Sequence, residues 1–107
     1  MDLWSEVKQL EGKVLKGLDQ RKPFEVVKVL NSAVIVMPLS TKKERMVHRK
    51  EFEGAYRELT ALGQISRNQI MALYSPWNPV YVAAMLAELP QVTHTIRPII
   101  LYYKREK

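Results

Sequence analysis

The chain has 107 residues, the size of a single domain, and its 47% hydrophobic and 26% charged residues are typical of a globular protein and exclude wholesale disorder. Cysteine is absent, which excludes disulfides, cysteine-ligated metals and thiol nucleophiles, and the presence of only two histidines argues against a transition-metal site. The net charge of +6 favours a polyanionic partner.

The N-terminal residues predict neither a signal peptide nor a membrane anchor. The chain begins MDLWSEVKQL, with an acid at position 2 and charges at positions 6 and 8. The uncharged stretch 68–87 is interrupted by polar residues and prolines, so its apolar part is too short to span a bilayer. We therefore expect a cytoplasmic protein.

The first predicted element is an amphipathic helix within residues 3–18. Apolar residues at positions 3, 7, 10 and 14 have helical spacing, and Gly12 and Gly17 weaken the helix prediction beyond Leu10. A turn at 19–23 separates this helix from a segment of different periodicity.

Three short β-strands are predicted next. Residues 24–30 are rich in β-branched side chains, and a polar break at 31–32 leads to 33–37, which is apolar on both faces and is expected to be buried on both sides. The polar loop 40–44 precedes a third strand at 45–48. Together they predict an antiparallel three-stranded meander.

Helices are predicted for most of the remaining chain. Residues 52, 55, 56, 59 and 62 form an apolar stripe that ends at Gly63, and Ser66 is placed to cap a short helix at 67–73. Asn78 and Pro79 are typical of a helix start, and the helix they begin is expected to run to Leu89. Two β segments follow, at 92–96 and 98–103.

The order of elements after residue 48 carries a family resemblance. The connection Leu62-Gly63-Gln64-Ile65-Ser66 joins two helices through a glycine and a capping serine, and a third helix is followed by a hairpin with Arg97 near its tip. Residues 49–103 therefore resemble the winged helix-turn-helix DNA-binding superfamily. The chain is also similar to small modules of bacterial restriction and mobile-element systems.

This resemblance implies that residues at the start of the third helix face DNA bases. They are Trp77, Asn78, Tyr81 and, less directly, Ser75. The helix departs from the family pattern because it carries no lysine or arginine and is nearly all apolar. Its composition favours a core helix or a dimer or partner interface over base reading.

The positive charge is concentrated in two segments. Residues 41–57 hold six basic and three acidic side chains, net +3, and residues 97–107 hold four and one, also net +3. Hydroxyls beside lysine and arginine at 40–45 are suited to phosphate contacts, and positions 45, 47 and 49 are expected on one strand face. The complete set of candidate nucleic-acid contacts is Lys42, Lys43, Arg45, Arg49, Lys50, Arg57, Trp77, Asn78, Tyr81, Arg97, Lys104 and Arg105.

Catalysis is not expected. The sequences Glu6-Val7-Lys8 and Glu11-Gly12-Lys13 match a short nuclease element but lack a strand with an aspartate upstream. Neither His48 nor His94 belongs to a recognisable triad, and four scattered glycines cannot form a phosphate loop. We expect no cofactor and no metal.

The sequence thus predicts one α+β domain: an N-terminal helix and a three-stranded antiparallel meander over residues 1–48, then a winged-helix-like three-helix unit with a C-terminal β-strand over residues 49–107. The favoured function is binding of double-stranded DNA with low or modest sequence specificity. The alternative is a protein-interaction module, an accessory or inhibitor subunit that docks through the apolar helix 78–89 and an exposed Trp4 or Trp77.

Overall fold

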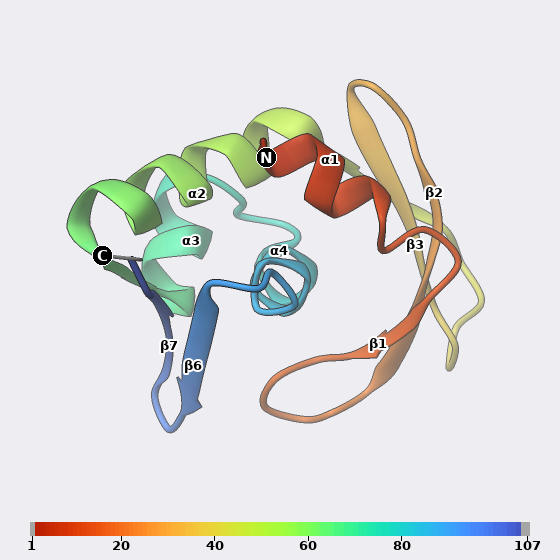
Figure 1. Ribbon diagram of the computed structural model, residues 1–107. Helices are drawn as coiled ribbons and strands as arrows, with labels where there is room; N and C mark the ends of the chain where they lie inside the picture. The colour runs from red at the N-terminus through yellow and green to blue at the C-terminus, as the bar shows by residue number, and fades with distance from the viewer. Residues whose placement is uncertain (1, 106–107) are drawn as a thin grey trace.

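Four antiparallel strands in the first half of the chain form one sheet, in the order β1-β2-β3-β4. The strands are β1 (Val14–Lys16), β2 (Pro23–Val29), β3 (Ala33–Pro38) and β4 (Arg45–His48). The computed structural model describes residues 2–105 and is shown in Figure 1. The last three strands agree closely with the predicted meander. Their β-branched residues favour strands, and the burial of one face fixes the register in which the strands pair.

The N-terminal segment differs from the prediction. Helix α1 (Leu3–Lys8) is short, and β1 adds a fourth strand where the helical spacing continued. Gly12 has a positive φ of 84°, and its N–H donates to the carbonyl of Val26 at 2.7 Å. The chain therefore turns at this glycine and pairs its backbone with β2, so the predicted meander of three strands is a sheet of four.

Strand β3 is fully buried on one face, and on the other face, in contrast to the prediction, Ala33 is buried but Ile35 and Met37 keep partial exposure. Val34 and Val36 are fully buried, whereas Ile35 between them is half-buried. Figure 1 shows the helices on one side of this sheet, which explains why the other face keeps contact with solvent.

The second half contains three helices and a three-stranded antiparallel sheet. Chain order is α2 (Arg49–Leu62), β5 (Gln64–Ser66), α3 (Arg67–Leu73), α4 (Pro79–Leu86), β6 (Val92–Ile96) and β7 (Ile99–Tyr103). Strand β7 is central and pairs with both β5 and β6. Helix α4 ends at Leu86, one turn before the predicted Leu89.

Local signals define the ends of α2 and α3. Gly63 follows α2 in the left-handed region, with φ of 85°, which glycine adopts without steric cost. Ser66 caps α3, because its Oγ accepts from the Gln69 N–H at 3.1 Å while the Gln69 side chain accepts from the Ser66 N–H at 2.8 Å. Both positions were predicted correctly.

Helix α4 lies at the centre of the molecule. Five of its eight residues are buried, from Val82 to Leu86, and it contacts α2, α3 and β1. The result is a compact α+β domain with a Cα radius of gyration of 12.7 Å. Across residues 2–105, none of the helices has the length and apolar character needed to cross a membrane.

Candidate functional site

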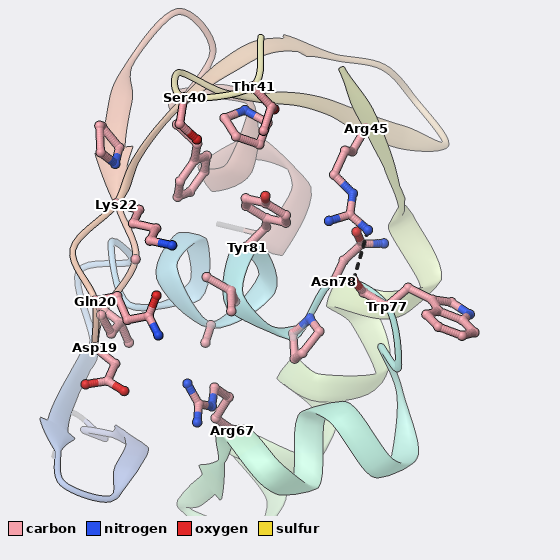
Figure 2. A pocket seen from close by; sticks show the side chains of 18 of the residues that line it. Asp19, Gln20, Lys22, Ser40, Thr41, Arg45, Arg67, Trp77, Asn78 and Tyr81 are labelled. Atoms are coloured by element: carbon pink, nitrogen blue, oxygen red, sulfur yellow. Dashed lines mark hydrogen bonds between the residues drawn. The ribbon is translucent and has the colours of Figure 1, made fainter. Parts of the chain in front are cut away.

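A cavity of about 620 Å³ opens between the two sheets, where the β1–β2 and β3–β4 loops approach the first turns of α3 and α4. Its walls come from segments that are distant in sequence, and Figure 2 shows them closely. We call it the basic cavity because, of the described residues, four cationic side chains and one carboxylate line it. The cations are Lys22, Lys43, Arg45 and Arg67, and the carboxylate belongs to Asp19.

The cations reach the cavity from different sides. In Figure 2 the side chains of Lys22 and Gln20 extend inward from the β1–β2 loop, and Arg67 extends inward from the start of α3. Ser40 and Thr41 lie at the opposite margin, on the β3–β4 loop. The arrangement concentrates positive charge and hydroxyl groups around one opening, which is the chemistry that phosphate oxygens require.

Arg45 is held in place at this margin. Its Nη2 donates to the backbone carbonyl of Trp77 at 3.3 Å, and its guanidinium lies 5.7 Å from the ring centroid of Tyr81. The dashed line in Figure 2 marks the hydrogen bond. These contacts connect β4 to the loop before α4 and position one charge over an aromatic face.

The floor of the basic cavity is apolar. The ring of Tyr81 packs edge-to-face on the buried ring of Phe24, with centroids 5.0 Å apart. Pro23, Pro38, Val80 and Ile99 also line the space. The cavity therefore combines a charged rim with a hydrophobic interior, as small-molecule sites commonly do.

Asn78 lines the cavity with an unsatisfied polar atom. The residue is only 8% exposed, and across residues 2–105 no donor reaches its Oδ1. The sequence predicted that Asn78 caps α4; it occupies the cap position, but its side chain makes no capping hydrogen bond. A buried acceptor without a partner costs about 1 to 3 kcal/mol, so its position calls for an explanation.

Arg49 does not belong to this site. It begins α2 rather than continuing the face of β4, and Val47 between it and Arg45 is fully buried. Its side chain forms an ion pair with Glu53 at 3.2 Å, donates to the carbonyl of Asn31 at 3.1 Å and stacks over Trp4 at 4.8 Å. The expected shared face of positions 45, 47 and 49 is therefore wrong, and Arg49 has a structural role.

The remaining predicted cations are dispersed. Lys42 lies beside the basic cavity in the same loop as Lys43, and the others line no part of it; they are Lys50, Arg57, Arg97, Lys104 and Arg105. Arg105 donates to the carbonyl of Thr60 at 2.5 Å, so the C-terminal end lies along the last turns of α2. Figure 1 shows this end across the molecule from the first sheet. The hairpin cations at 42–45 therefore lie apart from the C-terminal end, whereas the end of α2, which follows Arg57 of the same basic segment, lies beside it.

Helix α4 is poorly placed to enter a DNA groove or to dock a partner along its length. Strand β1 contacts it, and Tyr81 is half-buried against Phe24. Met85 is fully buried within the chain itself. Of the four side chains predicted to face bases, only that of Trp77 is freely accessible, with 80% exposure.

Trp4, expected to be exposed, is buried. Its indole N–H donates to the carbonyl of Leu30 at 2.8 Å, and its ring packs edge-to-face on Phe52. The amphipathic spacing of α1 placed Trp4 beside the apolar stripe, and the structure places it within the core.

Two cations of the basic cavity were missed by sequence reasoning, Lys22 and Arg67. Lys22 lies in a predicted turn within a segment of nearly balanced charge, and Arg67 is the only basic residue of 58–96. A count of charge by segment did not select either residue, because neither lies in a segment with a large excess of positive charge. The only sequence signal for them was their place in the predicted elements: Lys22 lies in the predicted turn 19–23, and Arg67 is the first residue of the predicted short helix.

Ser75 does not face an external ligand. It is fully buried, and its Oγ donates to Oε1 of Glu51 at 2.5 Å, while Oε2 of Glu51 accepts from the His48 N–H at 2.8 Å. One carboxylate thus connects the start of α2 to the loop before α4.

Glu51→Ala is expected to destabilise the fold by about 2 to 4 kcal/mol, because it leaves a buried hydroxyl and a backbone N–H at the helix start without their acceptor. Chemical denaturation measures the loss. Glu53→Ala, on the same helix but with an exposed ion pair, is the control and should change stability by less than about 1 kcal/mol. Equal losses for the two variants would contradict this role for Glu51.

Comparison with protein-family models, with curated proteins and with solved structures gives no match for this chain.

Proposed function

We propose that this protein binds nucleic acid through its phosphate backbone at the rim of the basic cavity. The observation that carries the proposal is the convergence of Lys22, Lys43, Arg45 and Arg67 around one opening with Asp19 as the single opposing carboxylate among residues 2–105. Cationic side chains beside hydroxyl groups contact phosphate oxygens without reading sequence. Duplex DNA is the expected class of nucleic acid.

Residues 49–103 form a winged-helix-like unit under this proposal. The element order from α2 to β7 supports it, as does the pairing of β5 with the hairpin β6–β7. The first sheet covers α4, the helix that would otherwise read bases, so binding is expected to have low sequence specificity. A bacterial restriction or mobile-element setting, which the resemblance seen in the sequence supports, is part of the proposal.

Duplex affinity is expected to fall steeply with salt. Four phosphate contacts give a slope of log affinity against log salt of about −3.6, which is a loss of about 150-fold between 50 and 200 mM. A gel-shift series on unrelated duplexes at several salt concentrations measures the slope. Nearly equal affinities for the different sequences are expected at each salt. No binding at about 50 mM salt would contradict the proposed function.

A protein partner is the second candidate. Trp77 is 80% exposed at the margin of the cavity, and the neighbouring Val80, on the apolar floor, is 43% exposed. Exposed aromatic side chains are common anchors at interfaces. This surface is the N-terminal end of α4 rather than the whole helix 78–89 expected from sequence. Apolar docking is only weakly salt-dependent, so the same salt series separates the two functions.

A further inference from the structure

The depth of the basic cavity is not explained by phosphate contacts alone. Backbone phosphates need only the cationic rim, whereas the interior is lined by Phe24, Tyr81, Val80 and Ile99. A volume of about 620 Å³ lies within the range of sites that hold small organic ligands. The interior therefore fits a flat apolar group attached to a phosphate.

The unsatisfied oxygen of Asn78 indicates that the flat group of the ligand carries a hydrogen-bond donor. Its Oδ1 is an acceptor that is buried without a donor, on a residue that lines the cavity and does not cap its own helix. The oxygen is closed to solvent, so the amide has to turn toward the cavity before an N–H on the edge of a ligand ring can supply the missing donor. Amino N–H groups on the edge of a flat base, next to an anionic phosphate, are the combination found in a nucleotide such as an adenylate.

We propose that the basic cavity binds one unstacked nucleotide, with the base on the apolar floor and the phosphate at the cationic rim. This inference rests on the proposed function when the nucleotide is an unpaired residue of a DNA strand. The same chemistry is present in a free mononucleotide. The experiment separates the two sources.

Three probes are used in equilibrium binding: a fully paired duplex, the same duplex with one extrahelical adenosine, and free adenosine 5′-monophosphate. The wild type is expected to bind the bulged duplex about tenfold more tightly than the paired duplex, which is the scale of one stacked base. Replacing the extrahelical base by 2-aminopurine should give an emission change on binding. Binding of the free mononucleotide with the affinity of the bulged duplex identifies the free nucleotide as the source.

A cavity-filling variant tests the location. Val80→Phe adds a ring to a half-exposed residue of the cavity wall and keeps all four cations, so it is expected to abolish the tenfold preference while paired-duplex binding stays unchanged. Leu62→Phe is the matched control, because Leu62 is 70% exposed at the end of α2 and lies outside the cavity. A bulge preference that came from duplex bending would persist in both variants.

Asn78→Ala provides a second variant that does not depend on filling space. Removal of a buried, unpartnered acceptor should leave the melting temperature unchanged or raised, because no hydrogen bond is lost. The preference for the bulged duplex should fall severalfold. Unchanged preference in both Val80→Phe and Asn78→Ala would overturn the proposal.

The wild-type results separate this inference from the proposed function. Equal affinity for the paired and bulged duplexes, without mononucleotide binding, overturns the nucleotide site and leaves phosphate binding intact. Mononucleotide binding without any duplex binding supports the nucleotide site and rejects DNA as the partner. If the protein binds none of the three probes, both the nucleotide site and the proposed DNA binding are rejected.

Discussion

The combined change Lys22→Ala, Lys43→Ala and Arg67→Ala is expected to reduce the salt slope of duplex binding by about 3. Only Arg45 then remains at the rim, and a single contact loses affinity about fourfold between 50 and 200 mM salt. The affinity should fall alike on every duplex sequence, because phosphate contacts carry no sequence information. Gel shifts at several salt concentrations measure both effects.

The control removes the same charge from elsewhere. Lys50, Arg57 and Lys104 are exposed, lie outside the cavity and were expected from sequence to contact DNA. Their combined change to alanine also lowers the net charge by three. The slope of log duplex affinity against log salt should remain close to that of the wild type. If this control lost the slope and the rim variant kept it, the interface would lie along α2 and the C-terminal end.

Arg45 is left out of the rim variant for a structural reason. Its hydrogen bond to Trp77 and its position over Tyr81 link β4 to the start of α4, so its loss would disturb the cavity as well as the charge. Lys22 and Lys43 are exposed, and no described hydrogen bond involves their side chains in residues 2–105. Changes in binding at these positions therefore report charge rather than folding.

Elements with local signals were predictable from sequence. Strand β4, the turn at Gly63 and the cap at Ser66 occur where expected, because each depends on a few neighbouring residues. Strand β1 was not predictable in this way. It has three residues, and its backbone pairing with β2 determines its conformation against a helical spacing of apolar residues.

The candidate site was only partly predictable for the same reason. Lys43 and Arg45 were found because they lie in one polar hairpin. Lys22 and Arg67 come close to Lys43 and Arg45 only because the first sheet packs against α4. Such tertiary packing cannot be predicted from a short stretch of sequence. The hidden acceptor of Asn78 is likewise a property of tertiary packing, since the sequence around it predicts an ordinary helix cap.

The covered position of α4 connects fold and function. The winged-helix arrangement proposed for residues 49–103 would make this helix the reader of the major groove, whereas in the structure it is a core helix with five of its eight residues buried. The same packing that covers this helix creates the cavity at its N-terminal end. Stability of the fold and the identity of the binding surface therefore depend on one structural feature, the burial of α4.

Met85→Ala tests that burial directly. Met85 is fully buried on α4, so truncation is expected to destabilise the protein by about 2 to 5 kcal/mol through lost burial and a residual cavity. Met71→Ala on α3 is the matched control, because Met71 is 45% exposed and its truncation should cost only about 0.5 kcal/mol. Denaturant unfolding of both variants measures the difference. Similar small losses would mean that α4 is exposed in solution, and base reading or partner docking along the whole helix would then replace the cavity as the leading explanation of function.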